Sequence, residues 1–371
     1  MQFSAKRDLL LNSLSLAQGI IEKKNTLEIL SNILIQIKEN KLIIVATDLD
    51  LVFTDEIEGI TVKQEGSTTT SATILYDILK KTSSNTEVSF ELKSENKLNV
   101  KTDSSDFNLK CLPTEGFPNI SDNFVQEGIE LNRSKLLSLL NKTKISISND
   151  DTRHYLSGIF LHLTEADGKK FLTAVATDSH RLSSCSIEIE KEKKFFSLIL
   201  PKKAVFQLCN LLQESSDKVL MQTSDSKIQF KIGKAKLTSK VIDGKFPDYR
   251  KVVPTSNDKT LIVSSKDFID SIETVTAVSV DRKEGVKLIL DNDNIKFSVN
   301  STNTGDGNKS IKAKYNSNEI SISFNSKYLI DIASEIEDNN IKINLKDSVS
   351  PVLIEDNADK NSYYVVMPMK I

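Results

Sequence analysis

The tetrapeptide VATD occurs twice, at Val45–Asp48 and at Val175–Asp178, and the two copies lie 130 residues apart. A helical pattern follows each copy at the same distance: ILYDILKK around Asp77 and AVFQLCNLL around Gln207, also 130 residues apart. Two separate markers that shift by an equal number of residues indicate an internal repeat. The sequence therefore predicts that one structural unit is used more than once.

A third, more diverged copy follows. The strand pattern IKFSVNS places Val299 124 residues after Val175, and the helical pattern YLIDIASEI places Asp331 124 residues after Gln207. At 371 residues the chain also exceeds what one hydrophobic core normally organises. We expect three similar domains, at residues 1–124, 125–256 and 257–371.

Each predicted unit opens with a capped amphipathic helix. The capping residues are Ser4 before AKRDLLLNSL, Asn132 before RSKLLSLLNKT, and Ser264 or Ser265 before KDFIDSIETV. Alternating patterns such as KLIIVATDLDLVF and KFLTAVATDSHRL predict strands, and a second short helix follows them. The fold class is therefore α+β, with two helices and about eight strands per unit, the helices packed on antiparallel sheets.

The composition is that of an ordinary globular protein, with 39% hydrophobic and 27% charged residues. No apolar run reaches the roughly 18 residues that a membrane-spanning helix needs, and the N-terminus lacks the pattern of a signal peptide. Three widely spaced cysteines, Cys111, Cys185 and Cys209, predict reduced thiols. We expect a cytoplasmic protein that does not bind membranes.

The sequence contains few patterns that are typical of catalytic or metal-binding sites. The stretch ATDSHRL places Asp178, Ser179 and His180 side by side, but neighbours in an extended segment point to opposite faces, so Ser179 and His180 cannot act as nucleophile and base together. The sequence contains no GxxxxGK[ST] phosphate loop, no HxxxH pair and no CxxC motif. We expect no cofactor, no metal and no catalysis.

Basic residues cluster on or beside several predicted helices. A net charge of −2 argues against nucleic acid only if charge is spread evenly, because helices that share one face can concentrate it. Each of these bases can equally be a solvated helix end. The residues are Lys23, Lys24, Lys80, Lys81, Arg133, Lys135, Lys142, Lys144, Lys202 and Lys203.

Five motifs together resemble one family: TRHYLSGI, VATDSHRLS, VIDGKFPDYRKVVP, SFNSKYLIDI and the closing YYVVMPMKI. They are similar to the bacterial DNA polymerase III beta subunit, the sliding clamp, in the expected order and over essentially the whole chain. The resemblance implies a noncatalytic DNA clamp fold: a homodimeric ring of six domains that encircles double-stranded DNA without reading its sequence, tethers the replicative polymerase and confers processivity.

The resemblance also implies residues for three contacts. Residues close to DNA would be Lys24, Lys80, Arg153, His154, Tyr155, Lys202 and Lys203, with Asp150 nearby in a role that its charge makes doubtful. Phe107 and Leu109, in the strand SDFNLK, would pack near Ala277 and Val278 of a second copy.

The third contact is a groove for short linear peptides of the polymerase III alpha subunit, the clamp loader delta subunit, other polymerases and repair proteins. Pliable methionines beside a proline suit a groove that accepts several peptides. Its implied lining is Leu156, Thr177, Ser179, His180, Arg181, Leu182, Pro247, Lys251, Val252, Asn325, Tyr328, Val349, Val365, Met367, Pro368, Met369 and Lys370. Ser179 stands where the family usually has glycine.

Two other hypotheses remain open on the sequence. One is a hydrolase or transferase that uses His180 with Asp178 in a cleft. The other is a monomeric scaffold that binds proteins but not DNA. The mass of the particle in solution separates a ring from a monomer.

Overall fold

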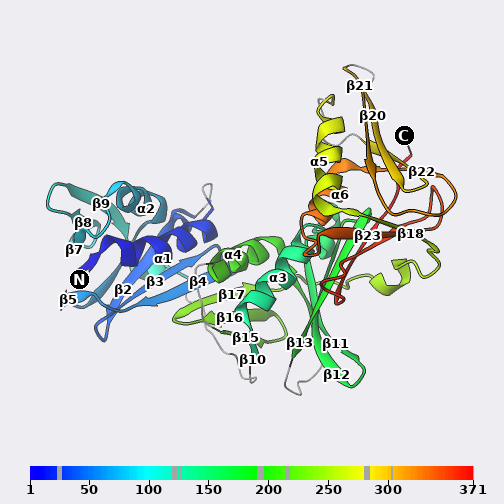
Figure 1. The fold of residues 1–371 in the computed structure, drawn as a ribbon. Coiled ribbons are helices and arrows are strands. Elements are labelled where there is room, and N and C mark those ends of the chain that lie inside the picture. The colour runs from blue at the N-terminus through cyan, green and yellow to red at the C-terminus, as the bar shows by residue number, and fades with distance from the viewer. Residues whose placement is uncertain are drawn as a thin grey trace. The chain divides into compact units, whose positions relative to one another are not determined.

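The structure, a computed structural model, describes residues 1–22, 27–118, 124, 128–189, 196–213, 218–279, 285–301 and 304–370. Its elements follow one order three times: a strand, a helix, four strands, a second helix and three strands (Figure 1). The first repeat carries one additional short strand, β5. The predicted repeat of two helices and about eight strands is confirmed.

The elements of the three repeats have the following bounds. The first comprises β1 (Gln2–Lys6), α1 (Arg7–Ile20), β2 (Asn32–Lys38), β3 (Lys41–Thr47), β4 (Leu51–Ile57), β5 (Thr61–Gln64), β6 (Gly66–Ser71), α2 (Ala72–Lys81), β7 (Glu87–Ser94), β8 (Lys97–Lys101) and β9 (Asp106–Leu112). The second comprises β10 (Ile129–Leu131), α3 (Arg133–Lys144), β11 (Gly158–Ala166), β12 (Lys169–Thr177), β13 (Arg181–Ile189), β14 (Ser197–Pro201), α4 (Lys202–Gln213), β15 (Val219–Thr223), β16 (Lys227–Ile232) and β17 (Ala235–Lys240). The third comprises β18 (Lys259–Ser264), α5 (Ser265–Thr276), β19 (Gly285–Asp291), β20 (Asn294–Ser301), β21 (Gly305–Lys312), β22 (Ile320–Asn325), α6 (Ser326–Ala333), β23 (Asn340–Leu345), β24 (Val352–Glu355) and β25 (Ser362–Val366).

Strands of successive repeats pair directly with each other. β4 of the first repeat pairs antiparallel with β17 of the second, with Leu51 opposite Ser239. β13 of the second pairs antiparallel with β25 of the third, with Arg181 opposite Val366. β4 and β13 hold the same place in their repeats, and so do β17 and β25. One type of strand pair therefore forms both junctions.

The chain folds into two compact parts. One contains residues 1–137 and 203–241, the other residues 138–202 and 242–371. The first part holds a sheet in the order β10-β15-β16-β17-β4-β3-β2-β6-β9-β8-β7-β1-β5. The second holds the order β14-β11-β12-β13-β25-β24-β23-β18 and a four-stranded sheet, β21-β20-β19-β22. Each junction lies inside one compact part.

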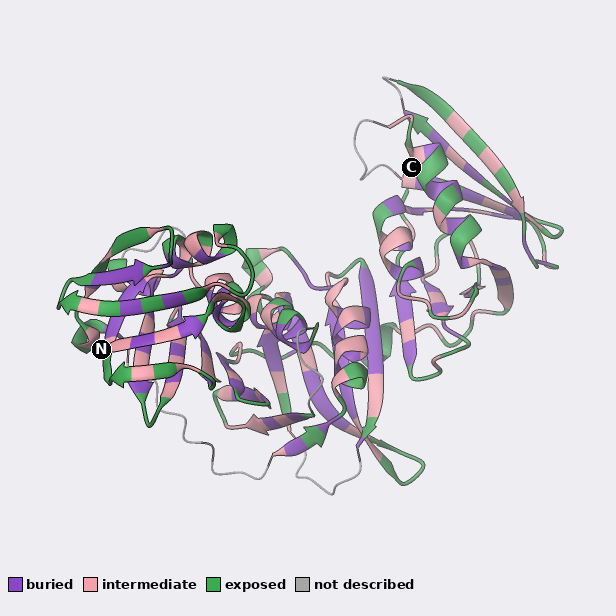
Figure 2. Ribbon diagram, turned by 60° about the vertical axis from the view of Figure 1, so that its left-hand side comes forward, coloured by how far each residue is buried: buried purple, intermediate pink, exposed green. Residues whose placement is uncertain are grey.

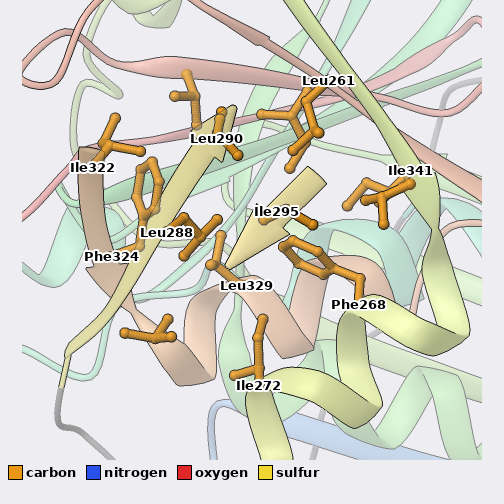
Figure 3. Packing of buried hydrophobic residues seen from close by; sticks show 14 of the residues in the cluster. Leu261, Phe268, Ile272, Leu288, Leu290, Ile295, Ile322, Phe324, Leu329 and Ile341 are labelled. Carbon is orange, nitrogen blue, oxygen red and sulfur yellow. The ribbon is translucent and has the colours of Figure 1, made fainter. Parts of the chain in front are cut away.

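Alternation along the strands builds the cores, as the bands of buried and exposed residues in Figure 2 show. In β20, Ile295, Phe297 and Val299 are buried. The Phe297 ring meets Phe268 of α5 edge-on, with ring centroids 5.5 Å apart. Figure 3 shows these strands and helices directing their apolar side chains into one core. Each large buried side chain contributes about 2 kcal/mol, so this core stabilises the third repeat.

Two of the three predicted helix caps are present. The Asn132 side chain accepts a hydrogen bond from Lys135 N, and the Ser264 side chain accepts one from Asp267 N. The expected Ser4 cap was wrong, because Ser4 lies in β1 and donates its hydroxyl hydrogen to Glu87 Oε1 at 2.6 Å. Strand pairing of β1 with β7 therefore extends past the predicted helix start.

Lys142 of α3 is a buried cation. Its Nζ lies 2.7 Å from Asp359 Oδ2, 2.8 Å from Glu337 Oε1 and 3.9 Å from Asp356 Oδ2, and its side chain is 3% exposed. Burial alone would lower the pKa of this ammonium, but its hydrogen bonds to Asp359 and Glu337 raise the pKa overall. Asp356 is in turn held by the backbone N–H groups of Glu337 and Asp338.

The expectation that Lys142 adds to an accessible positive surface was therefore wrong. Its charge is neutralised by carboxylates about 200 residues away in the chain, which helix periodicity does not reveal.

Replacing Lys142 with methionine should destabilise the protein by about 3 kcal/mol, because three carboxylates would lose their shared cation. Chemical denaturation followed by circular dichroism measures this. Lys135→Met is the matched control, since Lys135 is exposed on the same helix. Equal stability of the two variants would contradict a stabilising role for the cluster.

Candidate functional site

A cavity of about 290 Å³ lies beside the junction of β13 and β25. Four segments of the second compact part form it: the end of the 3-10 helical segment η3 (Asp151–Leu156), the turn from β12 to β13, the segment around η4 (Tyr249–Val252), and β25 with the residues after it. Its lining consists of Leu156, Thr177, Ser179, His180, Arg181, Leu182, Pro247, Asp248, Tyr249, Val252, Val365 and Met367. We call it the junction groove.

The turn between β12 and β13 has a fixed conformation. The Thr177 hydroxyl oxygen accepts a hydrogen bond from Ser179 N, and Asp178 Oδ1 accepts from the backbone N–H of His180 and Arg181. These bonds hold Ser179 at a φ of 77°, in the left-handed region that non-glycine residues seldom adopt. Because its carboxylate is bound by the turn and by Arg181 Nε, Asp178 is not positioned to orient the His180 ring as a catalytic base.

Arg181 lines the groove, and two carboxylates neutralise its positive charge. Its Nη1 lies 2.8 Å from Asp331 Oδ2 and its Nε 3.2 Å from Asp178 Oδ2. The guanidinium also lies over the Tyr328 ring, 4.2 Å from the centroid. The junction groove therefore remains a mainly apolar site, although an arginine lines it.

The last strand, β25, and the residue that follows it, Met367, contribute to the lining of the groove. Met367 N donates a hydrogen bond to His180 O at 2.8 Å, which continues the pairing of β13 with β25 by one more residue. Met367 is 43% exposed, and Met369 is 38% exposed. The closing methionines thus lie at the surface rather than in a core.

The structure brings together ten of the seventeen residues expected in the groove. The other seven do not line the cavity: Lys251, Asn325, Tyr328, Val349, Pro368, Met369 and Lys370. Tyr328 lies beneath Arg181, Asn325 caps α6, and Lys251 pairs with Asp248 at 3.4 Å. Asp248 and Tyr249 line the cavity and were missed, although the motif FPDYR that contains them had been noted.

The hydroxyl of Tyr249 contacts a buried histidine, His162. His162 Nε2 lies 3.1 Å from the Tyr249 hydroxyl, and the His162 ring stacks on Phe160 with centroids 4.5 Å apart. Burial, and to a smaller extent the positive charge of Arg250, lower the pKa of His162 from about 6.5 to about 4. At neutral pH the imidazole is therefore uncharged and supports the groove wall.

This pKa predicts a pH dependence of stability. Between pH 6.5 and 4 the unfolded chain binds a proton at His162 more readily than the folded one, so the free energy of unfolding should fall as the pH drops through that window. His162→Phe should remove about 2 kcal/mol of the loss between pH 7 and 4.5. Urea unfolding of both proteins at the two pH values measures the difference, and parallel losses would rule His162 out as the cause.

None of the described residues expected near DNA is part of the lining of this cavity. Lys80 Nζ lies 5.5 Å from the centre of the Tyr76 ring, and the exposed Lys202 binds Asn149 Oδ1. Lys203 pairs with Asp48 and, at 3.3 Å, with Glu22. Lys24 lies outside the described residues, as does Lys23.

The segment Asp150–Leu156 carries the remaining expected DNA contacts. Arg153 Nε donates to Asp150 Oδ2 at 2.8 Å, and His154 Nε2 lies 3.2 Å from Asp243 O. Tyr155 packs close to Gly244, where an added Cβ would approach the Tyr155 Cβ to 3.0 Å. Asp150 is thus the partner of Arg153 rather than an isolated negative charge.

A second cavity, of about 440 Å³, lies in the first repeat between α2 and β9. Two exposed apolar residues border it: Ile74, which is 52% exposed, and Phe107, which is 37% exposed. Leu109 follows Phe107 on the same face of β9 and is partly buried. Ala277 and Val278 lie at the end of α5.

Within the described residues, no cluster of three His, Cys, Asp or Glu side chains could hold a metal ion. In that same part of the chain, no helix is both long and apolar enough to cross a membrane. Cys111, Cys185 and Cys209, all among the described residues, are buried and form no disulfide bond.

Three family models match successive stretches of the chain. They describe the N-terminal domain of the DNA polymerase III beta subunit at residues 1–121, its central domain at 130–248 and its C-terminal domain at 250–370. The beta sliding clamp of Caulobacter vibrioides is 33% identical over 374 residues, and that of Escherichia coli K12 is 31% identical over 371, each alignment covering 100% of both chains. The chain belongs to the DNA polymerase III beta subunit family.

Solved clamp structures agree with this fold. A Caulobacter crescentus beta sliding clamp superposes with a TM-score of 0.96 at 32% identity, covering 100% of this chain and 99% of that one. A Bartonella birtlesii sliding clamp bound to griselimycin gives 0.94 at 35% identity with both chains fully covered. The chain therefore has the three-domain clamp fold and the function of a sliding clamp, a noncatalytic processivity factor. The hydrolase or transferase hypothesis was wrong.

Proposed function

We propose that two copies of this chain close head to tail into a ring that encircles duplex DNA. The domains would be residues 1–124, 125–256 and 257–371. The observation that carries the proposal is the strand pair used at both internal junctions, β4 with β17 and β13 with β25. The equivalent strand of the third repeat is β21, and the strand equivalent to β17 and β25 in the first repeat is β9.

Both of these strands keep a free edge within the described residues. β21 pairs only with β20, and β9 pairs with β8 along residues 106–110 but with β6 only at Cys111 and Leu112. Free edges invite pairing with another chain. A β9–β21 pair between copies would repeat the internal junction and would close the ring, as cyclic symmetry requires.

The side chains beside these edges suit such a contact. Phe107 and Leu109 would pack against Ala277 and Val278 of the second copy, next to the cavity that Ile74 borders. Burying exposed apolar area at about 25 cal/mol per Å² supplies the driving force for association.

DNA would be held by enclosure and by a few cations. Lys24, Lys80, Arg153, His154, Tyr155, Lys202 and Lys203 are the proposed contact residues. Phosphate contacts of this kind carry no sequence information and weaken with salt, which suits sliding. Such a protein would work in the cytoplasm.

Retention on circular DNA tests this proposal. The protein, loaded on nicked circular plasmid, should co-elute with it in gel filtration and be released when the plasmid is linearised. Phe107→Glu, which places a charge at the apolar contact, should give the mass of one copy in light scattering and no retention.

Phe107→Leu is the control, because it keeps an apolar side chain and should stay a retained dimer. A wild-type mass equal to one copy, as a monomeric scaffold would give, contradicts the ring. So does equal retention on linear DNA.

We further infer that the junction groove binds short peptides of the replicative polymerase, the clamp loader and repair proteins. Its apolar lining and exposed Met367 support this role, because such surfaces accept related peptides by repacking. The proposed set retains the seven residues outside the cavity as an extension of the same surface.

Deleting residues 367–371 should weaken binding of a fluorescent clamp-binding peptide by at least about tenfold, because it removes one wall of the groove. The mass of the dimer should not change. Deleting only residues 370–371, which leaves Met367 in place, is the control and should cost much less. Unchanged affinity in the longer truncation would refute the assignment.

A further inference from the structure

The conformation of the turn between β12 and β13 does not depend on the Ser179 hydroxyl. The first repeat contains the same turn: Thr47 Oγ1 accepts from Leu49 N, Asp48 Oδ1 accepts from Leu51 N, and Leu49 has a φ of 80°. A leucine and a serine thus adopt the same left-handed conformation directly after a threonine–aspartate pair. The threonine–aspartate pair imposes this conformation. The conformation therefore does not explain why residue 179 carries a hydroxyl group.

Among the described residues that hydroxyl has one hydrogen-bond partner, Arg153, and this partner can only donate. Arg153 Nη1 lies 2.5 Å from Ser179 Oγ, and a guanidinium has no acceptor. Arg153 is anchored in turn by Asp150, whose carboxylate accepts from Thr152 N and Thr152 Oγ1 as well as from Arg153 Nε. The hydrogen bonds from Thr152 have the largest effect on the pKa of Asp150, followed by the one from Arg153. Together they lower the pKa of Asp150 and keep its carboxylate ionised.

The hydroxyl hydrogen must therefore point away from Arg153. Ser179 is exposed and lines the junction groove, and its hydroxyl donates no hydrogen bond to another of the described residues. A peptide lying in the groove brings a row of carbonyl oxygens, which are the acceptors that a hydroxyl requires.

We propose that Ser179 donates a hydrogen bond to a carbonyl oxygen of the bound peptide, and that Arg153 orients the hydroxyl for it. This inference rests on the proposed peptide-binding role of the groove. Ser179 is the contacting residue and Arg153 a positioning residue. The segment Asp150–Leu156 then serves the groove twice, through Arg153 and through the Leu156 side chain that lines it.

Peptide titrations on the full-length dimer test the proposal. With a fluorescent clamp-binding peptide as the probe, Ser179→Ala keeps the Cβ and the backbone conformation and should bind about fivefold more weakly, the usual effect of one hydrogen bond. Ser179→Gly should lose the same affinity while its thermal midpoint rises, because glycine relieves the left-handed backbone. Ser94→Ala, in β7 of the first repeat, is the control and should bind as the wild type does.

The role of Arg153 is read from a double-mutant cycle. Arg153→Gln alone should weaken peptide binding about threefold, Arg153→Lys should restore most of the loss, and Ser179→Ala with Arg153→Gln should bind no more weakly than Ser179→Ala alone. Additive losses would overturn the positioning role. Equal binding by wild type and Ser179→Ala would overturn the inference but not the groove, whereas a wild type that binds no peptide would overturn both.

Discussion

Antiparallel pairing between strands of successive repeats is the constraint on which the rest of the structure depends. β4 with β17, and β13 with β25, join repeats edge to edge with backbone hydrogen bonds. A backbone ladder is indifferent to most side-chain changes, which explains why the repeats could diverge in sequence and keep the same junction. Among the described residues it also leaves β9 and β21 each with a free edge, because three repeats in a row form only two junctions.

The junction groove is a direct consequence of that pairing. Met367 reaches the groove because its backbone continues the ladder to His180 O, and Leu182 and Val365 face each other across the same strand pair. Arg181 with Asp331, and Lys142 with Asp359, add ion pairs between the second and third repeats. Buried ion pairs contribute little net stability when compared with apolar residues, but they penalise every arrangement that separates the partners. The walls of the groove are thereby fixed without the help of a ligand.

The sequence predicted the features that have a period and missed those that depend on distant partners. The 130-residue spacing of VATD predicted the repeat because equivalent strands keep equivalent patterns. The burial of Lys142 was not predictable, since Glu337 and Asp359 are far away in the chain. Tyr249 was missed because its support by His162 is visible only in three dimensions. The resemblance to a family named ten of the twelve cavity residues, whereas pattern alone had singled out only the ATDSHRL turn and the closing methionines.

The distribution of charge favours a weak attraction to DNA phosphates, which suits a sliding clamp. Several cations that composition alone would count toward phosphate binding already have anionic partners: Lys142 has three carboxylates, Lys203 has Asp48 and Glu22, and Arg153 has Asp150. Each pair must be broken before its cation can release counterions from DNA in full. The attraction per phosphate is therefore smaller than the number of bases implies. The proposed closed ring would not need a stronger attraction, because enclosure would prevent escape while weak contacts would allow movement along the duplex.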